Sequence, residues 1–126
     1  RHTHPLRPTV AGGAAAAREW MQRRTSAVIA HNDLMAMGFM IAVKSVGIEV
    51  PRDVSVVGTD NIFMSALFTP ALTTVTTSRN TQGKLAFNQL LEQLRHQHRD
   101  TGHLTTSIAM KLVERDSTAQ VPSLHR

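Results

Sequence analysis

Three short runs of apolar and β-branched residues constrain the fold of this chain most. They span residues 26–30, 54–57 and 72–76, and segments with a helical pattern separate them or follow them. Continuous apolar runs of this length are typical of strands buried in a parallel sheet. Alternation of strands with helices favours a parallel sheet with helical crossovers. The sequence therefore predicts an α/β fold, with the first run covered on both faces.

The helix expected over residues 34–46 has clear signals at both ends. Asn32 or Asp33 can cap its first turn, and Asp33 also suits the positive end of the helix dipole. Gly47 follows the last apolar residue and can adopt the left-handed backbone that ends a helix. The other expected elements are a helix capped by Thr9, a helix over residues 80–97, an apolar loop over 62–68 and a final strand over 107–113.

Length and composition limit the class of protein. The 126 residues, 41% of them hydrophobic, suit one globular domain. The absence of cysteine excludes disulfides, thiolate zinc sites and cysteine nucleophiles, and it fits a reducing, cytoplasmic setting. No run approaches the roughly 18 apolar residues that cross a bilayer, so we expect no membrane association. Residues 1–8 are expected to be a leader or a truncated end, 9–119 the folded part and 120–126 a tail.

The charge pattern and the motifs argue against several functions. The net charge of +5 comes from separate basic stretches, and with four phenylalanines and one tryptophan there is little to stack on bases, so direct nucleic-acid binding is not favoured. We find no glycine-rich phosphate loop, nucleophile elbow or oriented acid–base pair, so neither an enzyme nor a cofactor is predicted. His96, His98 and His103 lie in a polar linker without a carboxylate at ligand spacing, so no metal site is predicted.

Polar side chains follow the first two predicted strands. Asn32 comes after the first and Asp60 directly after the second. Open parallel sheets bind ligands at the carboxyl ends of their strands. An amide offers an acceptor and two donors to neighbouring hydroxyls, and a carboxylate accepts from hydroxyl or amine groups. Each residue also has a structural alternative, because Asn32 can serve as a helix cap alone and Asp60 can bond only its own turn. His31 lies at the mouth of this expected cleft. It is either a ligand contact or a packed or solvated histidine.

The helix over residues 34–46 has apolar side chains around most of its circumference, and one sheet cannot cover every face. The apolar stretch 62–68 adds further surface of the kind that monomers rarely expose. We therefore expect a two-fold homodimer interface. The alternative is a helix flanked by other helices of the same layer. The expected interface residues are Met37, Met40, Ile41, Met64 and Phe68.

Four motifs in this order resemble the ligand-binding core of the lac-repressor (LacI/GalR) family of transcriptional regulators. They are A-x-N-D at residues 30–33, V-P-x-D-V-S-V-V-G-x-D at 50–60, L-T-T-V at 72–75 and L-V-E-R-D-S-T at 112–118. The resemblance spans about residues 9–119, and the ordered combination is far more specific than any single motif.

The resemblance implies a periplasmic-binding-protein-like type I subdomain with three α/β/α layers, incomplete relative to the family's two-subdomain core. It also implies that Asn32 and Asp60, with Asn61 and Thr77 as further candidates, contact a small effector, a sugar or a related metabolite. Operator DNA would be bound only through an N-terminal helix-turn-helix domain that is absent here. The helix over 80–97 would normally pack on the absent first subdomain.

Two other readings stay open at this point. The first is a sugar-binding protein of a transport system, which shares the fold. The second is a small α/β enzyme or a receiver-like signalling domain, which would need a reactive constellation that the sequence does not offer.

Overall fold

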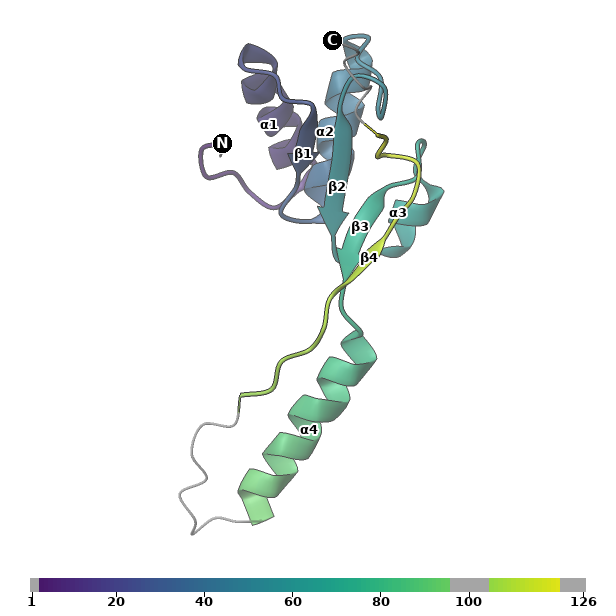
Figure 1. Ribbon diagram of the computed structural model, residues 1–126. Helices are drawn as coiled ribbons and strands as arrows, with labels where there is room; N and C mark the ends of the chain where they lie inside the picture. Colours follow the sequence, from purple (N-terminus) through teal and green to yellow (C-terminus); the bar gives the residue numbers. More distant parts are fainter. Residues whose placement is uncertain (1–2, 96–104, 121–126) are drawn as a thin grey trace, which may run out of the picture. The chain divides into compact units, whose positions relative to one another are not determined.

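The computed structural model describes residues 3–95 and 105–120, and the chain divides into two compact units. The first unit comprises Arg1–Thr76 and Leu112–Arg126, and the second comprises Thr77–Lys111. Figure 1 shows the elements in chain order. They are α1 (Val10–Gln22), β1 (Ala27–Ile29), α2 (Asp33–Ser45), β2 (Ser55–Thr59), α3 (Phe63–Leu67), β3 (Thr73–Thr76), α4 (Arg79–Arg95) and β4 (Lys111–Val113).

The sheet has the strand order β1-β2-β3-β4. β1 and β3 both pair with β2 in parallel, with Val28 opposite Val56 and Val57 opposite Thr73. The α/β fold with a parallel sheet is therefore confirmed. The predicted strands lie within one or two residues of the observed ones, except that the last strand covers only Lys111–Val113 instead of residues 107–113.

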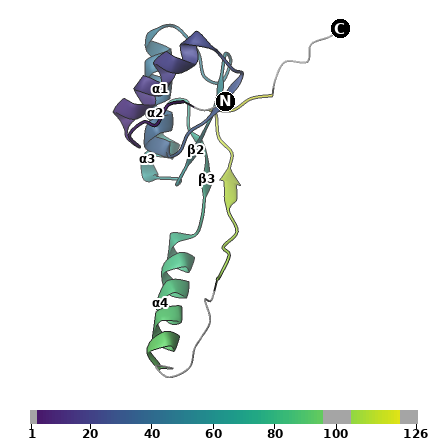
Figure 2. The same ribbon diagram turned by 90° about the vertical axis from the view of Figure 1, so that its left-hand side faces the viewer.

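Among the described residues, helices cover one face of this sheet. α2 packs on the strands and α1 packs on α2, and Figure 2 shows both helices on the same side of β2 and β3. Val56 and Gly58 point to this side and are buried. Ile29 on the other side is 81% exposed, so the prediction that the first strand is covered on both faces is wrong for the described residues. A second helical layer, as in an α/β/α sandwich, is not seen among them.

Two glycines allow α1 and α2 to approach backbone to backbone. A Cβ on Gly13 would overlap the carbonyl group of Met35, and a Cβ on Gly38 would overlap that of Val10. The caps predicted for these helices are confirmed: Thr9 Oγ1 accepts from Gly12 N, and Asn32 Oδ1 accepts from Met35 N. Gly47 has φ +79°, as expected at the end of α2.

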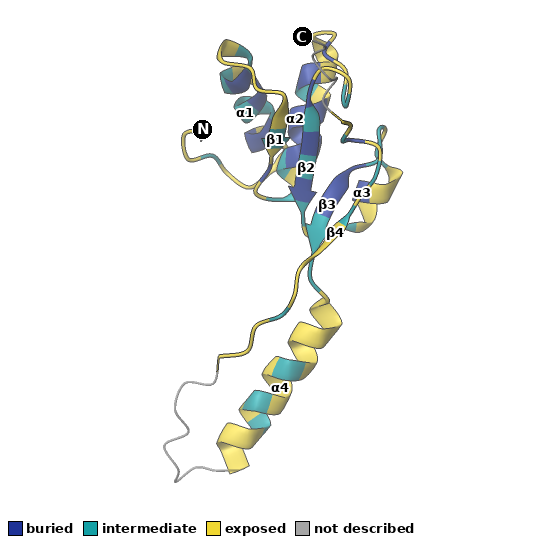
Figure 3. Cartoon of the chain, in the orientation of Figure 1, coloured by how far each residue is buried: buried dark blue, intermediate teal, exposed yellow. Residues whose placement is uncertain are grey.

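The hydrophobic core lies between these two helices and the sheet (Figure 3). Trp20 of α1 and Phe39 of α2 meet edge to face, with ring centroids 5.3 Å apart. Aromatic pairs prefer this arrangement, because the positive edge of one ring meets the negative face of the other. Val43, Val56 and Leu72 complete the fully buried centre.

The stretch predicted as an apolar loop contains a helix. α3 begins at Phe63 and ends at Leu67, and its Ser65 is fully buried. Five residues are too few to produce a detectable helical period, so the sequence pattern could not distinguish this helix from a loop. Its position depends on a distant residue, because Ser65 Oγ donates to the carboxylate of Asp33 at 2.5 Å.

The second unit contains α4, which has no buried residue. Phe87, Leu90 and Leu94 are each more than half exposed. Gln89 Nε2 donates to Thr106 Oγ1 at 2.6 Å within this unit. The predicted end of the helix at Gln97 and the three linker histidines, His96, His98 and His103, lie outside the described residues. No helix in the described part of the chain has the length and apolarity needed to cross a membrane.

Candidate functional site

The carboxyl ends of β1 and β2 meet at one edge of the sheet. Because the strands are parallel and adjacent, the residues that follow them lie side by side. Thr59 Oγ1 donates to Ala30 O at 3.4 Å, and Asp60 N donates to Val75 O at 2.9 Å, so this edge is also joined to the end of β3. Asn32 and Asp60 therefore share one rim. We call this rim, made of residues 30–33 and 59–62, the carboxyl edge.

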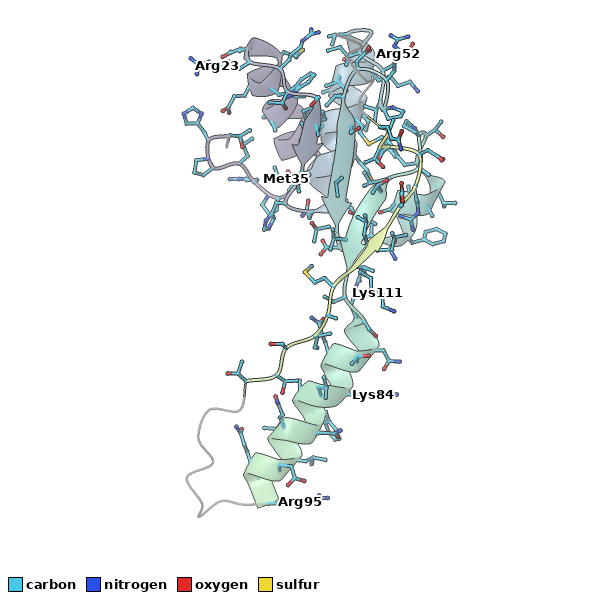
Figure 4. All side chains as sticks on the ribbon, viewed as in Figure 1. Arg23, Met35, Arg52, Lys84, Arg95 and Lys111 are labelled. Carbon is cyan, nitrogen blue, oxygen red and sulfur yellow. The ribbon has the colours of Figure 1, made fainter. Side chains whose placement is uncertain are left out.

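Asn32 is half-buried at this edge and makes two hydrogen bonds. Its Oδ1 accepts from Met35 N at 2.9 Å, and its Nδ2 donates to Pro8 O at 3.2 Å. Met35 is labelled in Figure 4, near the N-terminal turn of α2. A primary amide offers two donor hydrogens and two acceptor lone pairs. The helix cap and the contact to Pro8 therefore leave Asn32 one donor and one acceptor.

Asp60 and Asn61 form an unusual turn after β2. Asp60 has φ +109° and Asn61 has φ +50°, and they are the two non-glycine residues with positive φ among those described. Asp and Asn tolerate this region better than most residues because their short polar side chains bond locally. The side chain of Asp60 is exposed, and that of Asn61 is half-buried.

Asp33 lies behind this turn and is fully buried. Its Oδ2 accepts from Ile62 N at 2.9 Å and from Ser65 Oγ at 2.5 Å, and its Oδ1 accepts from Thr74 Oγ1 at 2.6 Å. A buried carboxylate needs such donors, because an unpaired charge in the interior is costly. The role of helix cap that the sequence predicts for Asp33 is wrong: Asn32 is the cap, and Asp33 joins α2, α3 and β3.

Arg115 is a further residue of this region that the sequence did not single out. Its guanidinium donates to Asn61 Oδ1 and to Leu72 O, both at 2.7 Å. Arg115 lies within the 112–118 motif, but its partner Asn61 lies 54 positions earlier in the chain. The local sequence pattern therefore gives no sign of this contact. The side-chain oxygen of Asn61 is thus already an acceptor within the chain.

The remaining predicted ligand contacts lie in different settings. His31 is exposed at the carboxyl edge. Thr77 follows β3 directly but begins the second unit, and it is half-buried. In the described part of the chain, no three His, Cys, Asp or Glu residues are placed to hold a metal ion.

The residues predicted for a dimer interface divide into two groups. Met37 and Met40 are buried in this chain and offer little exposed surface for an interface, although Met40 also contributes to the lining of a groove beside α2. Ile41 and Met64 are each 51% exposed, and Phe68 is half-buried. A surface groove of about 620 Å³ lies between the C-terminal half of α2 and the segments 48–50 and 68–70. Its lining residues are Met40, Ile41, Lys44, Ser45, Ile48, Glu49, Val50, Phe68, Thr69 and Pro70.

Comparison with known families matches residues 1–118 to the periplasmic binding protein-like domain. The chain belongs to this family of domains, whose parallel α/β sheet it shares.

Similar proteins show to which kind of protein within this family of domains the chain is related. The chain is 40% identical over 101 residues to the HTH-type transcriptional repressor PurR of Edwardsiella ictaluri, covering 80% of this chain but 29% of that repressor. Among solved structures it resembles a LacI family transcriptional regulator from Enterococcus faecium with bound ribose, with a TM-score of 0.82, 26% identity and coverage of 93% of this chain and 43% of the other. It also resembles a LacI family regulator from Arthrobacter sp. FB24 in complex with lactose, with a TM-score of 0.76, 28% identity and coverage of 90% and 43%. Within the family the chain thus corresponds to the C-terminal portion of a LacI/GalR-type regulator.

Proposed function

We propose that this chain is the effector-binding and dimerisation part of a LacI/GalR-type transcriptional regulator. A small effector, a sugar or a related metabolite, binds at the carboxyl edge. Its binding allosterically controls DNA recognition by a helix-turn-helix domain of the kind that the name of the PurR relative specifies. The observation that carries this proposal is the presence of Asn32 and Asp60 on one rim of a parallel sheet, in a fold whose neighbours hold ribose and lactose.

The chemistry of the carboxyl edge suits a ligand with several hydroxyl or amine groups. Asp60 presents an exposed carboxylate, which accepts charge-assisted hydrogen bonds from such donors. Asn32 keeps one donor and one acceptor beyond its cap and its contact to Pro8. His31 remains a further candidate contact within the first unit. The cap role of Asn32 and a ligand contact by the same side chain are therefore compatible.

The regulator is favoured over a sugar-binding protein of a transport system. The PurR relative is named as a repressor, and both sugar-bound neighbours are named as transcriptional regulators. These names support a protein that senses its ligand to control transcription.

A thermal-shift screen followed by calorimetric titration tests the effector site. The panel contains sugars, among them D-ribose and lactose, together with purines and sugar phosphates. The substitution Asp60→Asn should weaken the bound compound about 10- to 100-fold, because it removes the charge from the hydrogen bonds that Asp60 accepts. Asp116→Asn is the matched control, since Asp116 is also an exposed acid and lies near the start of β3, where its N–H donates to Ala71 O. Wild-type affinity in Asp60→Asn, or a panel without any binder, would contradict the proposal.

The groove beside α2 supports dimerisation through a second copy of this chain. Ile41 and Phe68 are apolar residues of its lining, and Lys44 and Glu49, which carry opposite charges, also line it. A two-fold axis repeats the same patch on both subunits, so Lys44 of one copy can face Glu49 of the other.

Sedimentation over a concentration series tests the dimer. Ile41→Glu should shift the protein to monomer, whereas Leu34→Glu, at an exposed position near the start of the same helix, should leave the dimer intact. A wild-type protein that stays monomeric at tens of micromolar would contradict this part of the proposal.

A further inference from the structure

The Asp60–Asn61 turn needs support from other parts of the chain. Two consecutive non-glycine residues with positive φ occupy a backbone region that side chains disfavour. Such a conformation persists only where surrounding contacts hold it in place. The residues that hold this turn therefore fix the backbone from which the exposed side chain of Asp60 projects.

One set of contacts approaches the turn from beneath. Thr74 of β3 accepts the N–H of Asn61 on its hydroxyl oxygen at 3.3 Å and donates its own hydrogen to Asp33 at 2.6 Å. Asp33 in turn accepts Ile62 N, the next backbone amide of the turn. Asp33 and Thr74 are both fully buried, so water does not compete for these bonds.

Gly58 shows how closely Asp33 is fitted under the turn. A Cβ at this position would overlap Asp33 Oδ1, and it would lie 3.0 Å from Leu72 Cδ2. The carboxylate of Asp33 therefore occupies the space that a side chain at position 58 would need.

A second set of contacts comes from the C-terminal segment. The guanidinium of Arg115 donates one N–H to Asn61 Oδ1 and another to Leu72 O. A guanidinium is planar and rigid, so two such bonds fix the Asn61 side chain relative to the residue before β3. Backbone and side chain of Asn61 are thus held by different residues.

We propose that Thr74 and Arg115, with Asp33 behind Thr74, are positioning residues that hold the Asp60–Asn61 turn in its left-handed backbone and so aim Asp60 at the effector. The inference rests on the proposed function for the effector itself. None of the three residues needs to touch the ligand. Their removal changes the direction of the Asp60 side chain, because the backbone next to it relaxes toward extended φ values.

The first test needs no ligand. Amide exchange and backbone chemical shifts of residues 60–62 are measured by nuclear magnetic resonance in the full chain and in four variants. Thr74→Val keeps the shape but removes the hydroxyl, and Thr74→Ser restores it. Arg115→Met removes both guanidinium bonds at a half-buried position and serves if Thr74→Val does not fold. Val43→Ala is a control that weakens the core on α2 without touching the turn.

Loss of the hydroxyl in Thr74→Val should speed exchange of the Asn61 amide roughly tenfold relative to the strand amides, because one buried hydrogen bond is removed. Thr74→Ser should return the Asn61 amide to within about threefold of wild type. Val43→Ala should change all protected amides of the first unit together. An unchanged turn in both Thr74→Val and Arg115→Met would overturn the proposal, whatever the result with ligands.

The second test uses D-ribose and adenine as probes in calorimetric titrations. Thr74→Val and Arg115→Met should weaken the probe that binds by about tenfold, comparable to the loss of one hydrogen bond, while Thr74→Ser and Val43→Ala keep wild-type affinity. Wild-type affinity in a variant whose turn has changed would show that the turn does not aim Asp60. If the wild-type protein binds no compound of the full panel, the effector proposal fails, and the first test alone decides the positioning role.

Discussion

The close approach of α1 and α2 gives a prediction about the stability of the variant Gly38→Ala. The contact between the two helices decides whether this substitution stabilises or destabilises the protein. Replacement of Gly38 by alanine should stabilise a helix by about 1 kcal/mol if only helix propensity mattered. The new Cβ would overlap the carbonyl oxygen of Val10 and lie 2.7 Å from its carbonyl carbon. Since ordinary contacts begin near 3.4 Å, the helices must separate by at least 3.4 − 2.7 = 0.7 Å.

The cost of this separation exceeds the gain in propensity. Overpacking costs about 1–3 kcal/mol, and the upper end applies because Val10 presents backbone atoms that cannot change rotamer. The expected net loss for Gly38→Ala is about 2 kcal/mol. For a domain of this size such a loss lowers Tm by about 10 °C.

Gly83 of α4 is the matched control, because a Cβ there meets nothing within 4 Å. Thermal unfolding followed by far-UV circular dichroism should show a lower Tm for Gly38→Ala and an unchanged or higher one for Gly83→Ala. Gly13→Ala meets the carbonyl group of Met35 in the same interface, so the double variant with Gly38→Ala should lose less than the sum of both. A Tm for Gly38→Ala equal to or above that of wild type would refute the backbone contact.

Three further predictions concern polar groups. Asp33→Ala leaves three donors without an acceptor and should lower the free energy of unfolding in urea by about 3 kcal/mol or more. Asp33→Asn keeps an acceptor oxygen and should lower it by about 1 kcal/mol. Equal losses in the two variants would contradict the hydrogen-bonding role of Asp33. Ser117→Ala deprives Thr73 N of its acceptor and Val56 O of its donor, with an expected loss of about 2 kcal/mol in the same assay, and no loss would contradict it. The pKa of Asp53 is lowered below its usual 3.8, mainly by the hydrogen bond from Arg52 and next by the hydrogen bond with the backbone of Glu49. The ionised Asp53 therefore stabilises the folded protein above pH 3.8, and this stabilisation disappears as the pH falls through the lowered pKa. The Tm values of wild type and Asp53→Asn should therefore converge in acid, and a difference that is independent of pH would contradict this explanation.

The sequence by itself determined the local features of this protein. The apolar runs, the caps at Thr9 and Asn32 and the stop at Gly47 each depend on residues within a few positions of one another, and the structure confirms them. The parallel pairing of β1 with β2 followed from the helix predicted between them, whereas the segment between β2 and β3 was predicted as an apolar loop. The order of four motifs also led to the family that the comparisons confirm. That Asn32 and Asp60 contact a ligand stays a prediction.

Only the tertiary structure decided which polar residues belong together. Asp33 looked like a cap because caps are local, but its partners Ser65 and Thr74 lie 32 and 41 positions away. Arg115 likewise bonds Asn61, which lies 54 positions away, so local sequence gave no sign of this pair. Met37 and Met40 were predicted at a surface because an all-round apolar helix does not reveal which side its neighbours cover. In the folded chain both belong to the buried core cluster. Periodicity records the face of an element and not its partner, so contacts between distant segments become visible only when the chain is packed.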